Sequence, residues 1–209
     1  MPKQDWLVTE AGNCIACESP RQWDLLIPTT QYRFYRFLCE LEDILEQAEI
    51  TGETEAEFLP NLRRLVRKLI LNVYWVNTRI PEPSPKTETG VLLLYDELGY
   101  PITIQTEIML PGTSTTIHNH GTWGVVATLK GQQKNTFWQR IPTSEFPHKI
   151  DKVEEKVLES GDIIALTTEA IHCVEAVGDE PSITLNIYGD TYPAKRFQFD
   201  ALTNKARNF

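Results

Sequence analysis

Two histidines stand one residue apart in the segment TTIHNHGTWGV, residues 115–125. They are His118 and His120, and they make up half of the four histidines in a chain of 209 residues. Residues i and i+2 of a β-strand point to the same face, so we expect the two imidazoles to project side by side. Neutral imidazoles in that arrangement are good ligands for a divalent metal ion. The pair alone is equally compatible with two ordinary strand residues.

A third ligand has to come from elsewhere in the chain, because two imidazoles hold a metal ion only weakly. His148 lies in SEFPHKID, a loop-like context, and we expect it at the surface. His172 lies in TTEAIHCVEAV, where a strand is expected to begin, and is the better third ligand. Cys173 follows it directly and should point to the opposite face of that strand.

The elements that must position these residues begin with helical periodicity. Apolar residues recur at helical spacing in residues 29–50, with Thr29 or Thr30 as the expected N-cap. Residues 54–76 predict a second helical region, with Pro60 marking a start or a kink near its beginning.

The period changes after residues 77–90, NTRIPEPSPKTETG, which contain three prolines and form the best internal boundary. Beyond it, strand-like runs of four to ten residues alternate with Gly, Pro and Asp signals, which indicates an antiparallel sandwich or barrel. Residues 1–28 have no clear pattern and are expected to be irregular. We therefore predict an N-terminal helical region, 1–89, packed on a β-barrel domain, 90–209, that carries the metal site.

The amino-acid composition limits the classes of binding partner that the protein is expected to have. The net charge is −9, which argues against nucleic acid or an anionic membrane as a partner held by bulk electrostatics. The basic segment NLRRLVRKLI, residues 61–70, fits the solvent face of an amphipathic helix. The sequence contains neither a membrane-length apolar run nor a signal-peptide pattern, so we expect a cytoplasmic monomer or homodimer. Cys14 and Cys17 form a lone C-x-x-C and are expected to be plain reduced thiols.

Between residues 112 and 131, the chain resembles the first cupin motif, which runs G-x5-H-x-H-x3-E-x6-G. Four positions match and the glutamate position is a glycine: Gly112, His118, His120, Gly124 and Gly131. The resemblance implies a mainly β fold, the cupin double-stranded β-helix or jelly roll.

The second cupin motif, G-x5-P-x-G-x2-H-x3-N, is matched in part. Gly161 and His172 keep their places, while Thr167, Glu169 and Ala176 replace the other motif residues. The resemblance therefore implies a metal site made of three histidines without the fourth, carboxylate ligand.

A three-histidine site with glycine in place of the glutamate is similar to that of the thiol dioxygenases, the cysteine dioxygenase and 3-mercaptopropionate dioxygenase family. That resemblance implies Fe(II) as cofactor, with Zn, Ni or Mn as alternatives, and a small thiol and dioxygen as substrates. Three neutral imidazoles leave open positions on one face of the metal, where a substrate can bind as thiolate. In the family, both oxygen atoms then go to the sulfur, giving a sulfinic acid.

Two departures from that family stand out. Its Ser-His-Tyr relay falls here on Thr184, Asn186 and Tyr188, and an asparagine cannot titrate as histidine does. We still expect these three residues to orient substrate and oxygen. The family's carboxylate-binding arginine has no counterpart in TETGVLLLYDELG, residues 87–99.

Other side chains are assigned on general grounds. Arg79, Arg140 and Arg196 remain as candidates for the cation that binds a substrate carboxylate, and nothing in the sequence favours one of them over the others. Trp123, Trp138 and Tyr95 are expected in the core, and Gln105 and Glu107 on a solvated strand face. Two alternatives to the dioxygenase stay open: another metal-dependent cupin enzyme, an isomerase, lyase or hydrolase, and a non-catalytic cupin that binds a small ligand.

Overall fold

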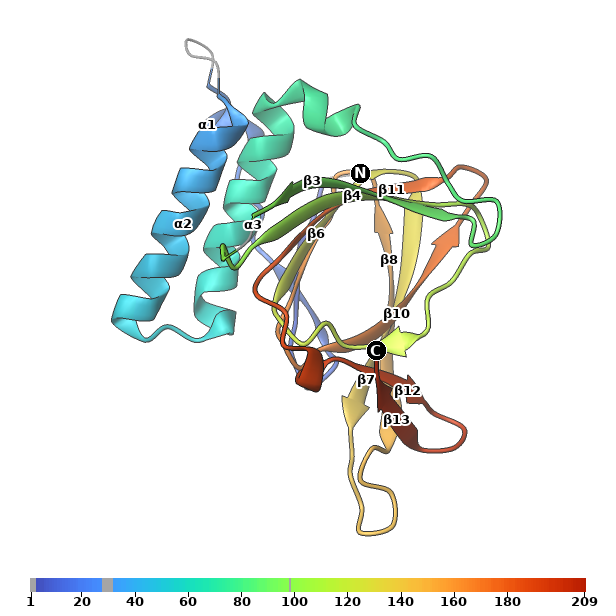
Figure 1. Ribbon diagram of the computed structural model, residues 1–209. Helices are drawn as coiled ribbons and strands as arrows, with labels where there is room; N and C mark the ends of the chain where they lie inside the picture. The colour runs from blue at the N-terminus through green and yellow to red at the C-terminus, as the bar shows by residue number, and fades with distance from the viewer. Residues whose placement is uncertain (1–2, 28–31, 98) are drawn as a thin grey trace.

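A computed structural model describes residues 3–27, 32–97 and 99–209, which form two sheets facing each other with helices on one side (Figure 1). The seven-stranded sheet has the order β2-β1-β9-β6-β11-β4-β3. Its strands are β1 (Asp5–Val8), β2 (Cys14–Cys17), β3 (Thr89–Asp96), β4 (Thr103–Met109), β6 (Gly124–Lys130), β9 (Ile163–Leu166) and β11 (Ser182–Tyr188).

The six-stranded sheet has the order β13-β12-β5-β10-β7-β8. Its strands are β5 (Ile117–His118), β7 (Gln132–Arg140), β8 (Ile150–Glu159), β10 (Ile171–Val177), β12 (Phe197–Asp200) and β13 (Lys205–Asn208). The strands from β4 to β11 divide between the two sheets. The seven-stranded sheet contains them in the order β4-β11-β6-β9 and the six-stranded sheet in the order β5-β10-β7-β8, with neighbouring strands antiparallel. This strand order is the double-stranded β-helix of cupins, and the predicted fold class is confirmed.

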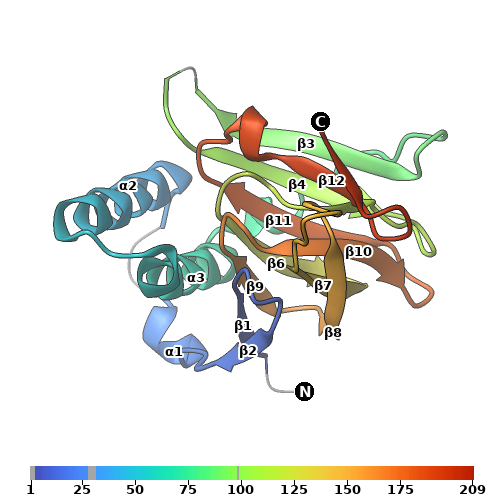
Figure 2. The same cartoon turned by 90° about the horizontal axis from the view of Figure 1, so that it is seen from below.

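Of the two long helices, α3 (Glu55–Asn72) packs against the outer face of the seven-stranded sheet and α2 (Phe34–Thr51) packs against α3 (Figures 1 and 2). A capping box between Thr54 and Glu57 starts α3, while the expected N-caps of α2 lie outside the described residues. Pro60 lies inside α3 and not at its start. Shorter helical turns are α1 (Gln22–Leu25), η1 (Tyr74–Asn77) and η2 (Pro193–Lys195).

The main core lies between α3 and the outward faces of β6, β9 and β11. Outward-facing side chains of those strands, such as Val125, Ala165 and Leu185, join apolar side chains of the helices, such as Leu62 and Leu69, in one buried cluster. The opposite faces of these strands line the barrel interior. Both faces are therefore covered, which explains why the strands are continuously buried instead of alternating.

The expectation that residues 1–28 are irregular is wrong. Strand β1 pairs parallel with β9, and β2 pairs antiparallel with β1. Each is only four residues long, too short for a period of two to be visible in the sequence. The seven-stranded sheet thus takes strands from both parts of the chain that the sequence divides at residue 89.

The basic segment of α3 is not a fully solvated face. Arg67 is 2% exposed and forms a buried ion pair with Asp5 of β1, and its Nη1 donates to the carbonyl oxygen of Gly161. Arg63 is 3% exposed and donates from Nη1 to the carbonyl oxygen of Trp6 at 2.9 Å. These arginines face the sheet because α3 lies between it and α2.

In the described part of the chain, no helix is long and apolar enough to cross a membrane.

Candidate metal centre

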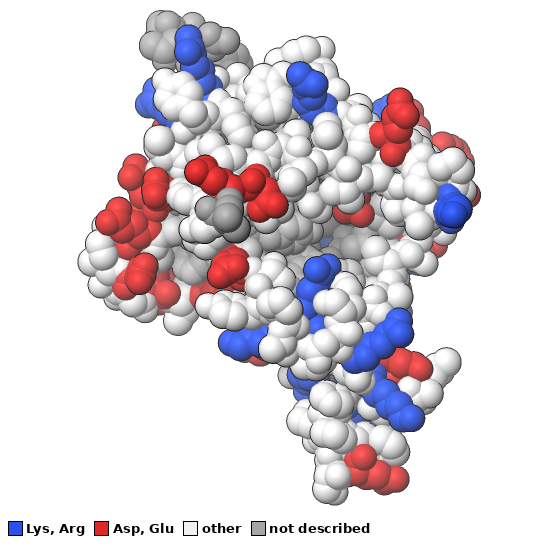
Figure 3. All heavy atoms as spheres, viewed as in Figure 1, with Lys and Arg blue, Asp and Glu red and all other residues white. Residues whose placement is uncertain are grey.

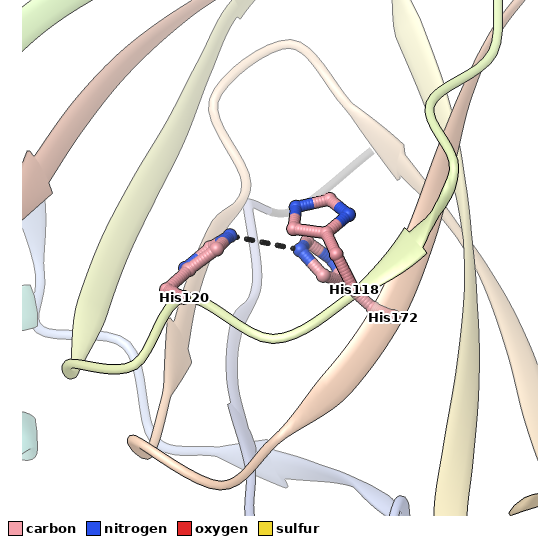
Figure 4. A group of neighbouring side chains, drawn as sticks. All are labelled: His118, His120 and His172. Carbon is pink, nitrogen blue, oxygen red and sulfur yellow. Dashed lines mark hydrogen bonds between the residues drawn. The ribbon is translucent and has the colours of Figure 1, made fainter. Parts of the chain in front are cut away.

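The three predicted histidines meet inside the barrel (Figure 4). His118 ends β5 and stands directly opposite His172 of β10 in the antiparallel register. His120 lies beyond the end of β5, so the expectation that both members of the pair sit on one strand is wrong. The chain bends at residues 121–122, after His120, and His120 points toward the other two histidines. One ring nitrogen from each histidine lies within 4.8 Å of the others.

Hydrogen bonds fix how two of the rings present their nitrogens. His118 Nδ1 donates to the carbonyl oxygen of Thr116 at 2.8 Å, and His172 Nδ1 donates to Asn135 Oδ1 at 3.0 Å. Each ring therefore carries its proton on Nδ1, and its Nε2 presents a lone pair to the common centre. Asn135, 2% exposed on β7, is a site residue that the sequence did not reveal.

The spacing of the nitrogens fits a bound ion. His120 Nε2 and His172 Nε2 are 3.1 Å apart, as the dashed line in Figure 4 marks. Two imidazole nitrogens that each lie about 2.0–2.1 Å from one ion are separated by about 3 Å when they subtend a right angle. This donor set fits a metal site of the kind that cupins carry.

Electrostatics keeps the three rings neutral. Burial lowers the pKa of His118, His120 and His172 below the ordinary value of 6.5. The neighbouring imidazoles lower the pKa of His120 and His172 further, and the positive charge of Arg196 lowers that of His118 and His120. Neutral imidazole is the form that binds a metal ion.

Gly124, at the position of the cupin glutamate, leaves room for the ring of Tyr188. A Cβ added there would lie 3.0 Å from Cδ1 and Cε1 of Tyr188 and 3.2 Å from Nδ1 of His120. The Tyr188 ring packs edge-on against His120, with ring centroids 4.8 Å apart. A glutamate at position 124 therefore meets the phenol ring, and the protein ligands that the structure brings together are the three histidines.

The histidines line a cavity of about 480 Å³ between the two sheets. Its size is in the range of sites for small molecules. Figure 3 shows a hollow in this face of the molecule, while acidic side chains gather over the helical side. Thr184, Asn186 and Tyr188 all reach the cavity from β11, so the predicted second group of residues lines the same cavity as the histidines.

The expected solvated position of Gln105 and Glu107 is wrong, because both side chains line the cavity. Alternation along β4 leaves either face free to be the inner one, and sheet packing puts this face inside. Glu107 Oε2 accepts a hydrogen bond from Asn186 Nδ2 at 3.1 Å, and burial raises the pKa of Glu107. Asn186 on β11 thus holds the carboxyl group of Glu107 on β4.

Arg196 is the arginine that reaches the cavity, whereas Arg140 stacks over Phe197 and Phe199 and Arg79 is exposed. Asn119, the residue between the two histidines, holds the Arg196 segment in place.

The Asn119 side chain makes two hydrogen bonds to that segment. Its Nδ2 donates to the carbonyl oxygen of Lys195 at 2.8 Å, and its Oδ1 accepts from the backbone N–H of Phe197 at 2.8 Å. Asn119 is completely buried. The segment just before β12 is therefore fixed beside the metal ligands, a link that no local pattern predicts.

The remaining assignments are simple. Trp123 is buried in the main apolar cluster, as predicted, whereas Tyr95 and Trp138 are only partly buried and pack against the edges of apolar clusters. His148 lies outside the three-histidine group and is half-buried against Phe197. Cys173 is not among the cavity-lining residues, in agreement with its predicted outward direction.

Cys14 and Cys17 are free thiols, and burial, with the charge of Glu154, raises the pKa of Cys14 to about 12.

No protein-family model matches the chain. Among solved structures, it is similar to oxalate oxidase in complex with glycolate, at 15% identity and a TM-score of 0.42, over 56% of this chain and 58% of that one. The aligned part is thus less than two thirds of the oxalate oxidase chain.

Two further solved structures are similar to the barrel. One is a conserved protein with a double-stranded β-helix domain from Klebsiella pneumoniae, 15% identical, with a TM-score of 0.41 over 54% of this chain and 85% of that one. The other is a cupin superfamily protein from Desulfitobacterium hafniense, 14% identical, with a TM-score of 0.38 over 49% and 77%. The fold assignment rests on the strand order, and these similarities say nothing about activity.

Proposed function

We propose that this protein is an Fe(II)-dependent dioxygenase that oxidises a small thiol to a sulfinic acid. The observation that carries the proposal is a set of three neutral imidazoles in a cavity between the two sheets, with the ring of Tyr188 where a carboxylate ligand would otherwise stand. A neutral ligand set leaves the full charge of the metal ion to favour a substrate thiolate. The Fe(II) ion, when bound to His118, His120 and His172, supplies thiol deprotonation and dioxygen activation.

The overall reaction balances without another reductant. One thiol, RSH, and one O₂ give one sulfinic acid, RSO₂H, so both oxygen atoms form bonds to sulfur and the O–O bond breaks. The sulfur supplies four electrons, which are those that dioxygen takes up.

The residues of the chain bind and orient the substrates. Burial, together with the negative charge of Glu107, raises the pKa of Tyr188, so its hydroxyl stays protonated and is a hydrogen-bond donor available to a ligand in the cavity. Thr184, which lines the cavity from the same face of β11, has its Oγ1 buried without a partner in the described part of the chain, which leaves this hydroxyl free for a ligand. Apolar side chains such as Val126 and Ile164 form another part of the wall.

Arg196 gives the cavity a place for an anionic group. Its guanidinium stacks over the ring of Phe209 at 4.2 Å, and its charge lowers the pKa of His118, His120 and Tyr188, so it lies near the metal ligands. A thiol with a carboxylate can place the sulfur at the metal and the carboxylate at Arg196. The arginine that the sequence lacks before the barrel is thus supplied from after β11.

The test is oxygen uptake by Fe(II)-loaded protein with a panel of small thiols, with the sulfinic acid identified by mass spectrometry. A His172→Ala variant serves as the blank. We expect uptake that requires both iron and His172, with one sulfinic acid formed per O₂ consumed.

Protein that holds one iron and consumes no oxygen with any thiol refutes the proposal. Loading the same protein with Zn, Ni or Mn and assaying hydrolysis, lyase activity and isomerisation then tests the Lewis-acid alternative.

A further inference from the structure

Strand β3 forms one edge of the seven-stranded sheet, beside β4 (Figure 2). In the described part of the chain, the two sheets have four edge strands, β2, β3, β8 and β13. Native proteins protect such edges by keeping them short or by placing charged side chains along them. Strands β2 and β13 are four residues long, and six of the ten residues of β8 are charged. Strand β3 has eight residues, TGVLLLYD, of which only the last is charged, so it lacks both kinds of protection.

The backbone of β3 has unpaired groups near its centre. The N–H of Leu110, which follows β4, donates to the carbonyl oxygen of Glu88, whereas the carbonyl oxygen of Thr89 accepts from the N–H of Ser84 on the other side. Backbone groups of alternate residues point to the same side of a strand, so those of Val91 and Leu93 point away from β4, as the Thr89 carbonyl does.

Among the described residues, the N–H and C=O groups of Val91 and Leu93 have no backbone partner. Each residue thus presents one donor and one acceptor to solvent at the edge of the sheet.

The two faces of β3 differ in how they are covered. The segment before β3 covers the face to which Gly90 and Leu92 point, because the carbonyl oxygen of Glu82 lies where a Cβ of residue 90 would stand. Val91 and Leu93 point to the opposite face and are 56% and 51% exposed. Val91 also lines the cavity, so these side chains lie where the cavity opens to solvent.

We propose that β3 is a dimerisation edge, at which two copies of this chain pair antiparallel about a two-fold axis at Leu92. Val91 then lies opposite Leu93 of the partner subunit, and each such pair exchanges two backbone hydrogen bonds. The exposed side chains of both residues meet on the inner face. Because Val91 lines the cavity, the partner subunit covers part of the cavity opening. The dimer does not depend on the proposed reaction.

The partner is a second copy because this edge is complementary to itself. The two residues with unpaired groups, Val91 and Leu93, are two positions apart, so an antiparallel copy places each donor opposite an acceptor. Their apolar side chains pack against the same side chains of the second copy, and no charge is buried. Of the four edges, this is the one without protection, so one contact closes the open edge of both copies and assembly ends at two.

The size of the contact sets its strength. Eight residues at about 3.4 Å each give an edge about 27 Å long, and a strip about 10 Å wide along it has an area of about 270 Å². A stable interface buries about 800 Å² on each partner, so the edge supplies roughly a third of that area. We therefore expect a reversible dimer with a Kd on the order of 10–100 µM, as for small transient interfaces.

Sedimentation velocity at about 1–300 µM protein covers the expected Kd and measures the association. A reducing buffer keeps the exposed Cys39 from crosslinking two copies. We expect the wild type to change from monomer to dimer over this range, and Leu93→Lys, which places an ammonium at the contact, to stay monomeric. The matched control is Val157→Lys, at a 44% exposed position of the edge strand β8, which should dimerise as the wild type does. Circular dichroism and thermal denaturation show whether both variants are folded.

Hydrogen exchange followed by mass spectrometry locates the contact without any variant. Peptides that contain residues 90–96 should exchange more slowly at about 300 µM than at about 1 µM, and peptides from β8 should not change. A wild type that stays monomeric at the highest concentration overturns the inference, and the edge is then open to a strand of another protein. A dimer that Leu93→Lys leaves intact, concentration-dependent protection confined to other strands, or a species larger than a dimer also overturns it.

Discussion

The hydrogen bond between His172 and Asn135 permits a quantitative test of the metal centre that needs no substrate. Asn135 Oδ1 accepts from His172 Nδ1 at 3.0 Å, and both side chains are buried. This bond holds the tautomer whose Nε2 faces the centre and makes that nitrogen more basic. Loss of such a partner of a metal-bound histidine typically weakens metal affinity 10–100-fold, about 1.4–2.7 kcal/mol. We expect Asn135→Ala to fall in this range.

The assay is competition for Fe(II) or Zn(II) against a chromophoric chelator of known affinity, under anaerobic conditions for iron. Asn135→Asp should restore most of the affinity, because a carboxylate accepts the same hydrogen bond. Gln133→Ala is the control: Gln133 lies two positions before Asn135 on β7, also lines the cavity, and contacts Met109 instead of a histidine. Asn135→Ala that binds metal within twofold of the wild type, or that loses no more than Gln133→Ala, refutes the role of this bond.

Other predictions concern stability and reactivity. Arg67→Met leaves Asp5 buried without its cation and should lower the free energy of unfolding by about 3–5 kcal/mol. The double variant Arg67→Met/Asp5→Leu should recover much of this loss, and denaturant titration measures both values. Iodoacetamide at about pH 8 should label the exposed Cys39 of the native protein but not Cys14, because burial raises the pKa of Cys14 to about 12. Peptide mass mapping identifies the labelled cysteine, and rapid labelling of Cys14 contradicts the structure. The folded state raises the pKa of Glu107 above its ordinary 4.5, so ionisation of this group costs stability only above that pH; the cost grows up to the folded-state pKa and is constant beyond it. Glu107→Gln should therefore raise Tm relative to the wild type at pH 7 but not at pH 4, and equal Tm differences at the two pH values contradict this.

The class of fold and the group of three histidines were predictable from the sequence alone. A period of two over many short runs requires strands, and the glycine spacing around His118, His120 and His172 places the histidines next to turns that a barrel needs. Such features depend on residues close together in the chain, where backbone geometry alone decides which side chains share a face. The long helices α2 and α3 were predictable for the same reason.

Tertiary structure decided which groups surround the metal. A strand pattern shows that Gln105 and Glu107 share a face, but only the packing of the two sheets puts that face inside the cavity. Arg196 and Asn119 are far apart in sequence from each other, and they meet because the chain after β11 folds back beside the end of β5.

The buried ion pair between Arg67 and Asp5 could not be predicted from the sequence either. Arg67 has the neighbours of a solvated helix residue, and its pairing with Asp5 arises because β1 adds to the sheet parallel to β9, directly under α3. Contacts between distant segments reflect the free energy of packing the whole chain, and a local pattern contains none of that information.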